Sequence, residues 1–266
     1  DDFGLYNVIG GVVSMFTFLN GALAGATSRF LTYELGRKDY ARLHKVFNVA
    51  IATHIMIAVF VVILAETIGL WFLYNKMTIP AERFDAAFWV YQISIVSCVL
   101  SITQVPYTAT IIARERMNIY AYVGIIEVVL KLVIVYLLTI STYDKLIVYA
   151  LLLFGVQTMI LIYYRVYCNK QFAECKLKLI KDRKMYKDMF VYASSDMIGN
   201  ISVLAQGQGL NILLNMFFGP AVNAARGIAY QVQGAVTQFS NNFMTAVKPQ
   251  IIKNYAAGKV NEMMEL

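Results

Sequence analysis

Charged residues and metal-binding side chains are scarce in this sequence. Only 15% of its 266 residues are charged, whereas a soluble domain carries about 25%. The three cysteines, Cys98, Cys168 and Cys175, have neither the spacing of a zinc site nor that of a disulfide framework, and only two histidines accompany them. These shortages argue against a soluble globular domain and predict that the chain holds no metal.

Motifs of catalysis and of nucleotide binding are also missing. The sequence contains no nucleophile–base spacing, no phosphate loop and no dinucleotide-binding fingerprint. We therefore expect no catalytic residue, no enzymatic activity and no cofactor, although Na⁺ or H⁺ could couple to a transport step. The net charge of +7 comes from basic connectors between apolar segments, so nucleic acid is not an expected partner.

Long apolar runs are what the sequence has in abundance. Hydrophobic residues make up 59% of it, and the mean hydropathy is +0.60. A helix that crosses a hydrocarbon core of ~30 Å needs ~20 predominantly apolar residues, and several runs reach that length. The sequence thus predicts an all-α polytopic membrane protein with seven transmembrane helices. Their expected ranges are Tyr6–Phe30, Val46–Tyr74, Ala86–Ala113, Ile119–Ile140, Leu146–Cys168, Met189–Phe218 and Val222–Val247.

Basic residues fall almost entirely on one side of these helices. Most of the 23 lysines and arginines lie in the connectors of that side, and three, Lys76, Arg83 and Lys145, lie in the others. Cytoplasmic loops carry the excess of Lys and Arg, so we expect the basic connectors in the cytoplasm and Asp1 outside. The sequence begins without Met and stops within an amphipathic stretch. We therefore expect truncation at both ends and, in the complete protein, one span before Asp1.

The first and last stretches of the sequence share a plan. Tyr33 and Gly36 follow the first predicted helix with the same spacing as Tyr255 and Gly258 after the last one, and basic residues flank both pairs. Both stretches run from outside to inside. This pattern is typical of transporters built from two parallel repeats.

The longest connector, residues 169–187, is also the most basic one. It is placed to join two halves, although a basic cytoplasmic loop could instead serve only to contact anionic lipid. We expect an N-terminal lobe at residues 1–187 and the start of a C-terminal lobe at residues 188–266.

The stretches Gly4–Lys45 and Phe218–Lys259 resemble the second and eighth helices of the multidrug/oligosaccharidyl-lipid/polysaccharide exporter (MOP) superfamily. The most specific part runs from Gly219-Pro220 through Asn223 to Lys248-Pro249. Within the superfamily, the chain looks most like the polysaccharide flippases of bacterial capsule and O-antigen assembly. The resemblance implies two six-helix lobes around a central cavity that opens alternately inward and outward in the bacterial cytoplasmic (inner) membrane. This chain would carry helices two to eight.

Ionisable groups inside predicted spans are candidates for that cavity, because a charge in hydrocarbon costs at least ~2.5–3.5 kcal/mol on insertion scales. Glu127 and Lys131 lie four residues apart and so share one helical face. They could line the cavity, or they could simply neutralise each other so that their helix inserts.

Two polar stripes accompany this pair on the last two predicted helices. At 100° per residue, the members of each stripe fall on one face, which lipid would not tolerate. Arg226 could alternatively reach out to the headgroups, and an aromatic often stands at its position in the superfamily. The first stripe consists of Asp196, Asn200, Gln208, Asn211 and Asn215, and the second of Arg226, Tyr230, Gln233, Thr237 and Asn241.

These observations favour a transporter that flips a polyprenyl-pyrophosphate-linked oligosaccharide across the membrane. Its expected partners are that lipid-linked oligosaccharide, membrane lipids and a glycan polymerase machinery. A cation-coupled multidrug or metabolite exporter of the same superfamily is the first alternative, but Lys131 and Arg226 offset the acidic cavity it would favour. A membrane-embedded glycan polymerase or glycosyltransferase is the second alternative. The short outer connectors count against it, because such an enzyme exposes large catalytic loops.

Overall fold

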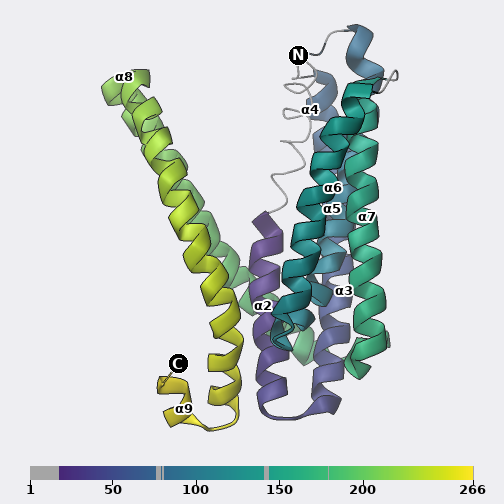
Figure 1. Ribbon diagram of the computed structural model, residues 1–266, viewed down its shortest axis with the longest axis vertical. Coiled ribbons are helices and arrows are strands. Elements are labelled where there is room, and N and C mark those ends of the chain that lie inside the picture. Colours follow the sequence, from purple (N-terminus) through teal and green to yellow (C-terminus); the bar gives the residue numbers. More distant parts are fainter. Residues whose placement is uncertain (1–17, 76–78, 80, 141–143, 179, 266) are drawn as a thin grey trace.

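The computed structural model describes residues 18–75, 79, 81–140, 144–178 and 180–265, and every regular element among them is helical (Figure 1). The elements are α2 (Phe18–Gly36), α3 (Tyr40–Leu64), the π-helix η2 (Ala65–Gly69), α4 (Leu70–Asn75), the 3₁₀-helix η3 (Ala81–Arg83), α5 (Phe84–Ala113), α6 (Met117–Ile140), α7 (Lys145–Gln171), the 3₁₀-helix η4 (Ala173–Cys175), α8 (Arg183–Ala256) and α9 (Val260–Met264).

Among the described residues, four helices are long and apolar enough to cross a membrane. They are the continuous helix Tyr40–Asn75, which α3, η2 and α4 build together, and then α5, α6 and α7. They match four of the predicted spans to within a few residues. The first predicted span, Tyr6–Phe30, begins outside the described residues and ends within α2.

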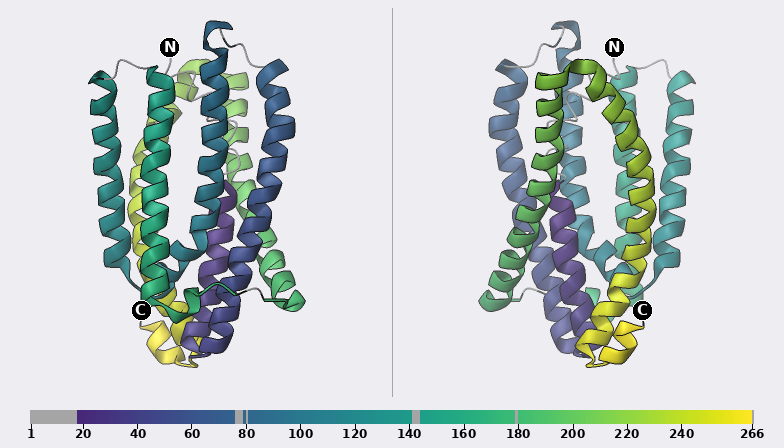
Figure 2. Two further views of the ribbon diagram at one scale, coloured as in Figure 1. Left: turned by 90° about the vertical axis from the view of Figure 1, so that its right-hand side faces the viewer. Right: turned by 90° about the vertical axis from the view of Figure 1, so that its left-hand side faces the viewer.

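Helix α8 contains the last two predicted spans. It is assigned as one helix of 74 residues, which would be ~110 Å long if it were straight. Figure 2 shows that it instead bends back on itself into two arms, which spread apart from the bend. Gly219-Pro220, at the middle of its residue range, lacks one backbone N–H donor and favours a sharp kink. The predicted break between the two spans is therefore a bend inside a continuous helix rather than a loop.

A π-turn interrupts the first long span where α3 passes into α4. The turn covers Ala65–Gly69, and the hydroxyl of Tyr91 on α5 donates to the carbonyl of Ala65 at 2.7 Å. Gly69 faces the same hydroxyl, and a Cβ there would clash with it. The carbonyl of Ala65 also accepts from the N–H of Leu70, so α5 adds a second hydrogen bond where the regular backbone ladder changes.

Two apolar clusters hold the first helices together. One joins α3, α5 and the start of α7 around Val61, Val90 and Ile102, and the other surrounds Phe47 and Ile111. α6 packs only along its edge, where Val123 and Ile134 are its buried residues. Most of its remaining apolar side chains are exposed in the chain, as expected for a helix that faces lipid.

Connectors predicted for one side of the membrane do meet at one end of the molecule. One end carries residues 37–39, 114–116, 172–178, 180–182 and 257–259 and is here called the basic end. There Arg114 pairs with Glu174 at 2.6 Å and Lys253 with Glu115 at 2.7 Å. At the opposite end, Arg83 pairs with Asp144. These pairs confirm the alternation of connectors between two ends.

Candidate functional site between the two halves

The predicted polar stripes fall on α8, and the structure describes them only in part. The side chains of Asp196, Asn200, Gln208, Asn211 and Arg226 lie outside its described residues. Tyr230, Gln233 and Asn241 are exposed on the second arm. Their place at a substrate cavity stays a prediction.

Glu127 and Lys131 are brought together on α6. The Nζ of Lys131 donates to Oε1 of Glu127 at 2.6 Å, and 38% of the Glu127 side chain and 52% of the Lys131 side chain are exposed. This is the contact that the four-residue spacing predicts. Its exposure leaves both groups accessible to whatever faces α6 in the membrane.

The halves contact each other at the basic end, where α2 packs against both arms of α8. Tyr192 on the first arm stacks edge-on against Phe30, with ring centroids 5.9 Å apart, and its ring lies 4.5 Å from the guanidinium of Arg29. From there the helices diverge. Figure 1 shows α8 leaning away from the bundle of α5, α6 and α7 toward the opposite end.

Both α2 and the second arm of α8 end in the same type of turn at this contact. The N–H of Lys38 bonds to the carbonyl of Leu35 and that of Asp39 to Glu34, and Gly258 and Lys259 repeat both bonds. This is the Schellman arrangement, in which one residue adopts positive φ. Lys38 (φ 58°) and Gly258 (φ 75°) hold that position.

The turns correct the register of the repeat. The spacing of tyrosine and glycine pairs Gly36 with Gly258, but the hydrogen bonds pair Gly36 with Ala256 and Lys38 with Gly258, two residues away. The sequence match followed the glycines, whereas only the second copy has glycine at the positive-φ position. The turn itself is common among helix ends and recurs at Glu115, so it sets the register without proving the duplication.

The two corresponding turns touch each other. A Cβ added to Gly36 would lie 2.8 Å from the Cβ of Ala256 and 2.6 Å from the carbonyl oxygen of Lys253. Such distances leave no room for any side chain at Gly36. The ion pair of Lys253 with Glu115 lies beside this contact and ties the turn between α5 and α6 to the second arm of α8.

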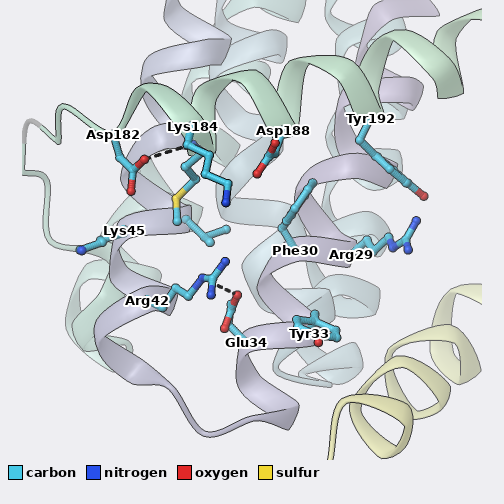
Figure 3. A pocket seen from close by; sticks show the side chains of 12 residues that line it. Arg29, Phe30, Tyr33, Glu34, Arg42, Lys45, Asp182, Lys184, Asp188 and Tyr192 are labelled. Atoms are coloured by element: carbon cyan, nitrogen blue, oxygen red, sulfur yellow. Dashed lines mark hydrogen bonds and ion pairs between the residues drawn. The ribbon is translucent and has the colours of Figure 1, made fainter.

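A pocket of about 600 Å³ opens next to the contact, between α2, α3 and the first arm of α8 (Figure 3). Lys184 and Asp188 of α8 line it from one side and Lys45 from another. Glu34 is buried in its wall, with Oε1 3.0 Å from the Nε of Arg42, while its Oε2 has no hydrogen-bond partner among the residues that the structure describes. Burial raises the pKa of this carboxyl, against the opposing effect of Arg42.

Two residues that organise this region carried no signal in the sequence. Asn48, a lone amide in an apolar helix, donates to the carbonyl of Lys176 at 3.1 Å and accepts from the N–H of Lys178 at 2.6 Å. It thereby fixes the connector between the halves to α3. Arg165 falls near the end of the predicted span Leu146–Cys168, and the structure places it inside α7, against Thr103 and Tyr107 of α5.

No family model matches this chain, and neither does any curated protein. Solved structures do match. An outward-facing conformation of a multidrug resistance MATE family transporter of the MOP superfamily superposes with a TM-score of 0.80 at 14% identity, over 99% of this chain and 58% of that one.

Two further structures agree with the first. A MOP superfamily transporter from Pyrococcus furiosus, whose binding pocket is described as reversed in polarity and suggestive of a different function, gives a TM-score of 0.78 at 13% identity, over 99% of this chain and 58% of that one. A MATE in complex with MaD5 gives 0.80 at 12% identity, over 99% of this chain and 60% of that one.

The fold is therefore all-α and matches part of the two-lobe fold of these MATE and MOP superfamily structures. The chain spans about 58% of the length of the first of them. The architecture that the resemblance of Gly4–Lys45 and Phe218–Lys259 implied is confirmed at the level of the fold.

Proposed function

We propose that the chain is part of a transporter that carries a polyprenyl-pyrophosphate-linked oligosaccharide from the inner to the outer leaflet. The observation that carries the proposal is the contact between corresponding turns at the basic end, from which the helices diverge. Contacts confined to one end let two halves rock about each other, so that the substrate path closes on one side and opens on the other.

The proposed transport cycle assigns a task to the contact between the halves. With Gly36 against Ala256 and Glu115 against Lys253, the basic end is closed and the path opens to the opposite side. Separation of both contacts would open the basic end. The positive-inside rule makes that end cytoplasmic, in the bacterial inner membrane, with residues 1–187 as one lobe and the chain from residue 188 on in the other.

The substrate class rests on the chemistry of the polar groups. A lipid-linked oligosaccharide needs sugar-binding amides and a cation for its pyrophosphate, while its tail stays among membrane lipids. Arginine suits pyrophosphate because its fork forms two parallel hydrogen bonds. The two α8 stripes would supply the amides and Arg226, with Glu127 and Lys131 on α6. A glycan polymerase machinery would then use the exported product.

A proton-coupled exporter of small molecules is the second candidate. The observation that favours it is Glu34, a buried carboxyl with a raised pKa at the contact between the halves. Such a group can bind and release a proton as its surroundings change.

Reconstitution of the full-length protein in liposomes separates the two candidates. A flippase should move a fluorescent polyprenyl-pyrophosphate oligosaccharide between leaflets without a pH gradient as driving force. An exporter should instead move a cationic dye only when a pH gradient is imposed. Dye transport without movement of the lipid-linked sugar would overturn the flippase proposal.

A further inference from the structure

Four of the basic residues that the structure describes are partly buried: Arg83, Arg114, Arg165 and Lys253. Arg165 differs from the other three. Each of the other three pairs with a carboxylate: Arg83 with Asp144, Arg114 with Glu174 and Lys253 with Glu115. Arg165 forms no ion pair among the described residues and instead contacts the hydroxyl of Thr103 at 3.2 Å and the ring of Tyr107 at 5.6 Å.

Half of the guanidinium fork of Arg165 is unused. Its Nε is buried and has no hydrogen-bond partner in the described part of the chain. Arg114 shows how a filled fork looks, because its Nε and Nη2 both donate to Oε1 of Glu174, at 2.8 and 2.6 Å. Arg165 offers the same two donors but gives one to a neutral oxygen and the other to none, although an unsatisfied buried donor is costly.

The position of Arg165 argues against a headgroup anchor. It lies six residues before the end of α7, ~9 Å inside the helix at 1.5 Å per residue. The pairs Gln157–Ser97 and Cys168–Tyr107 set the level of α7 against α5. At that register Arg165 donates to a residue at its own level, Thr103, rather than to one nearer the basic end. A snorkelling arginine would extend toward the headgroups.

We propose that Arg165, held between Thr103 and Tyr107, binds a phosphate-type oxyanion in the basic half of the first lobe. The oxyanion takes the Nε and Nη2 donors as Glu174 takes those of Arg114, while the Thr103 hydroxyl keeps its hydrogen bond to the carbonyl of Leu100 at 3.1 Å. On the proposed function, on which this last step rests, the ligand is the pyrophosphate of the lipid-linked sugar, taken up while the basic end is open. A membrane phospholipid is the other source of the same chemistry.

Thermal unfolding of the purified full-length protein in neutral detergent tests the site, with inorganic pyrophosphate as the soluble probe. Pyrophosphate should stabilise the wild type, and Arg165→Gln should weaken its apparent affinity about tenfold or more. Arg165→Lys, which offers a point charge instead of a fork, should lose most of that affinity too. Lys170→Gln removes an exposed charge from the last turn of the same helix and should leave the response unchanged.

A tethered anion covers the case in which Arg165→Gln fails to fold. Thr103→Asp places a carboxylate beside the open fork. It should raise the melting temperature without ligand and abolish the response to pyrophosphate. An Arg165→Gln protein that responds like the wild type, or a Thr103→Asp protein that keeps the wild-type response, would overturn the site.

Two further arms distinguish the sources of the oxyanion and separate this site from the proposed function. In nanodiscs, stabilisation by phosphatidylglycerol over phosphatidylcholine that depends on Arg165, with no response to pyrophosphate, would assign the site to lipid and overturn the pyrophosphate reading. Arg165-dependent binding of pyrophosphate in a protein that does not flip the lipid-linked sugar would leave the site standing and sink the flippase. Normal flipping by Arg165→Gln would leave the flippase standing and overturn the assignment of this site to its substrate.

Discussion

Glu34 is a buried carboxyl in the wall of the pocket beside the contact between the halves. One carboxylate oxygen pairs with Arg42, and the other is buried with no donor among the described residues. Burial outweighs the effect of Arg42 and raises the pKa of the carboxyl. The folded protein therefore binds this proton more tightly than the unfolded chain does. The free energy of unfolding must then fall as the pH rises above the ordinary value of 4.5.

Glu34→Gln removes this pH dependence, because an amide keeps an oxygen for Arg42 and cannot ionise. We expect the melting temperature of the wild type to fall relative to that of Glu34→Gln as the pH is raised from about 4.5 to neutrality. Glu82→Gln, at an exposed acid of the opposite end, serves as the matched control. Parallel melting curves of wild type and Glu34→Gln across this range would contradict the prediction.

Position 69 requires glycine, because a Cβ there would displace the hydroxyl of Tyr91. Gly69→Ala should therefore break the bond from Tyr91 to the carbonyl of Ala65 and destabilise the protein by about 1–3 kcal/mol. Gly124→Ala in α6 meets no neighbouring atom and should be neutral or stabilising. In a thermal unfolding series, Tyr91→Phe should restore part of the loss in Gly69→Ala. Additive losses in the double variant would show that the hydroxyl does not constrain Gly69.

The candidate site illustrates what sequence alone can provide at this scale. Spacing predicted the contact of Glu127 with Lys131, because neighbours four apart on a helix meet whatever surrounds them. Arg165 and Asn48 escaped notice, since their partners lie on other helices or on a distant connector. Contacts of that kind depend on how helices rotate against each other, and periodicity does not fix this rotation.

At the level of elements, the turns at the basic end differ in how well their residues fit. Gly258 adopts positive φ at no steric cost, whereas Lys38 adopts it with a Cβ. Gly258→Ala should destabilise the protein by about 1 kcal/mol, and Lys38→Gly should be neutral or mildly stabilising. Equal melting temperatures of Gly258→Ala and the wild type would show that the second turn does not require this conformation.

Helices were predictable from the sequence where a long apolar run decides them. The ranges of α3 to α7 follow the predicted spans closely, because ~20 apolar residues have few other stable arrangements in a membrane. The π-turn at Ala65–Gly69 was not predictable, since it depends on the hydroxyl that Tyr91 supplies from α5. The uninterrupted α8 was missed for a different reason, as Gly219-Pro220 signals a break and a bend equally well.

On the scale of the whole molecule, Gly36 controls how closely the halves approach. Gly36→Leu would place a side chain where the carbonyl of Lys253 and the Cβ of Ala256 already lie, so the basic end should stay apart. Spin labels on the exposed positions 37 and 259 should report a longer distance in the Gly36→Leu protein than in the wild type.

Charge reversal provides a control that does not change the volume of this contact. Lys253→Glu should lengthen the same distance by repulsion from Glu115, and the double variant Glu115→Lys/Lys253→Glu should restore it. An unchanged distance in both Gly36→Leu and Lys253→Glu would show that these contacts do not hold the basic end closed.

The meeting of Gly36 with Ala256 has a consequence for the symmetry of the molecule. On the predicted duplication, Gly36 and Ala256 are corresponding positions of two copies. Such positions meet at the two-fold axis that relates the copies, as one residue meets itself in the isologous interface of a homodimer. In a dimer every substitution is made twice, whereas a duplicated chain can change each side alone. The two sides of this contact are not equivalent, because a Cβ at Gly36 would meet the backbone of Lys253 as well as the Cβ of Ala256. Ala256→Gly should therefore keep the label distance of the wild type, whereas the exchange Gly36→Ala with Ala256→Gly should lengthen it, as Gly36→Ala alone does.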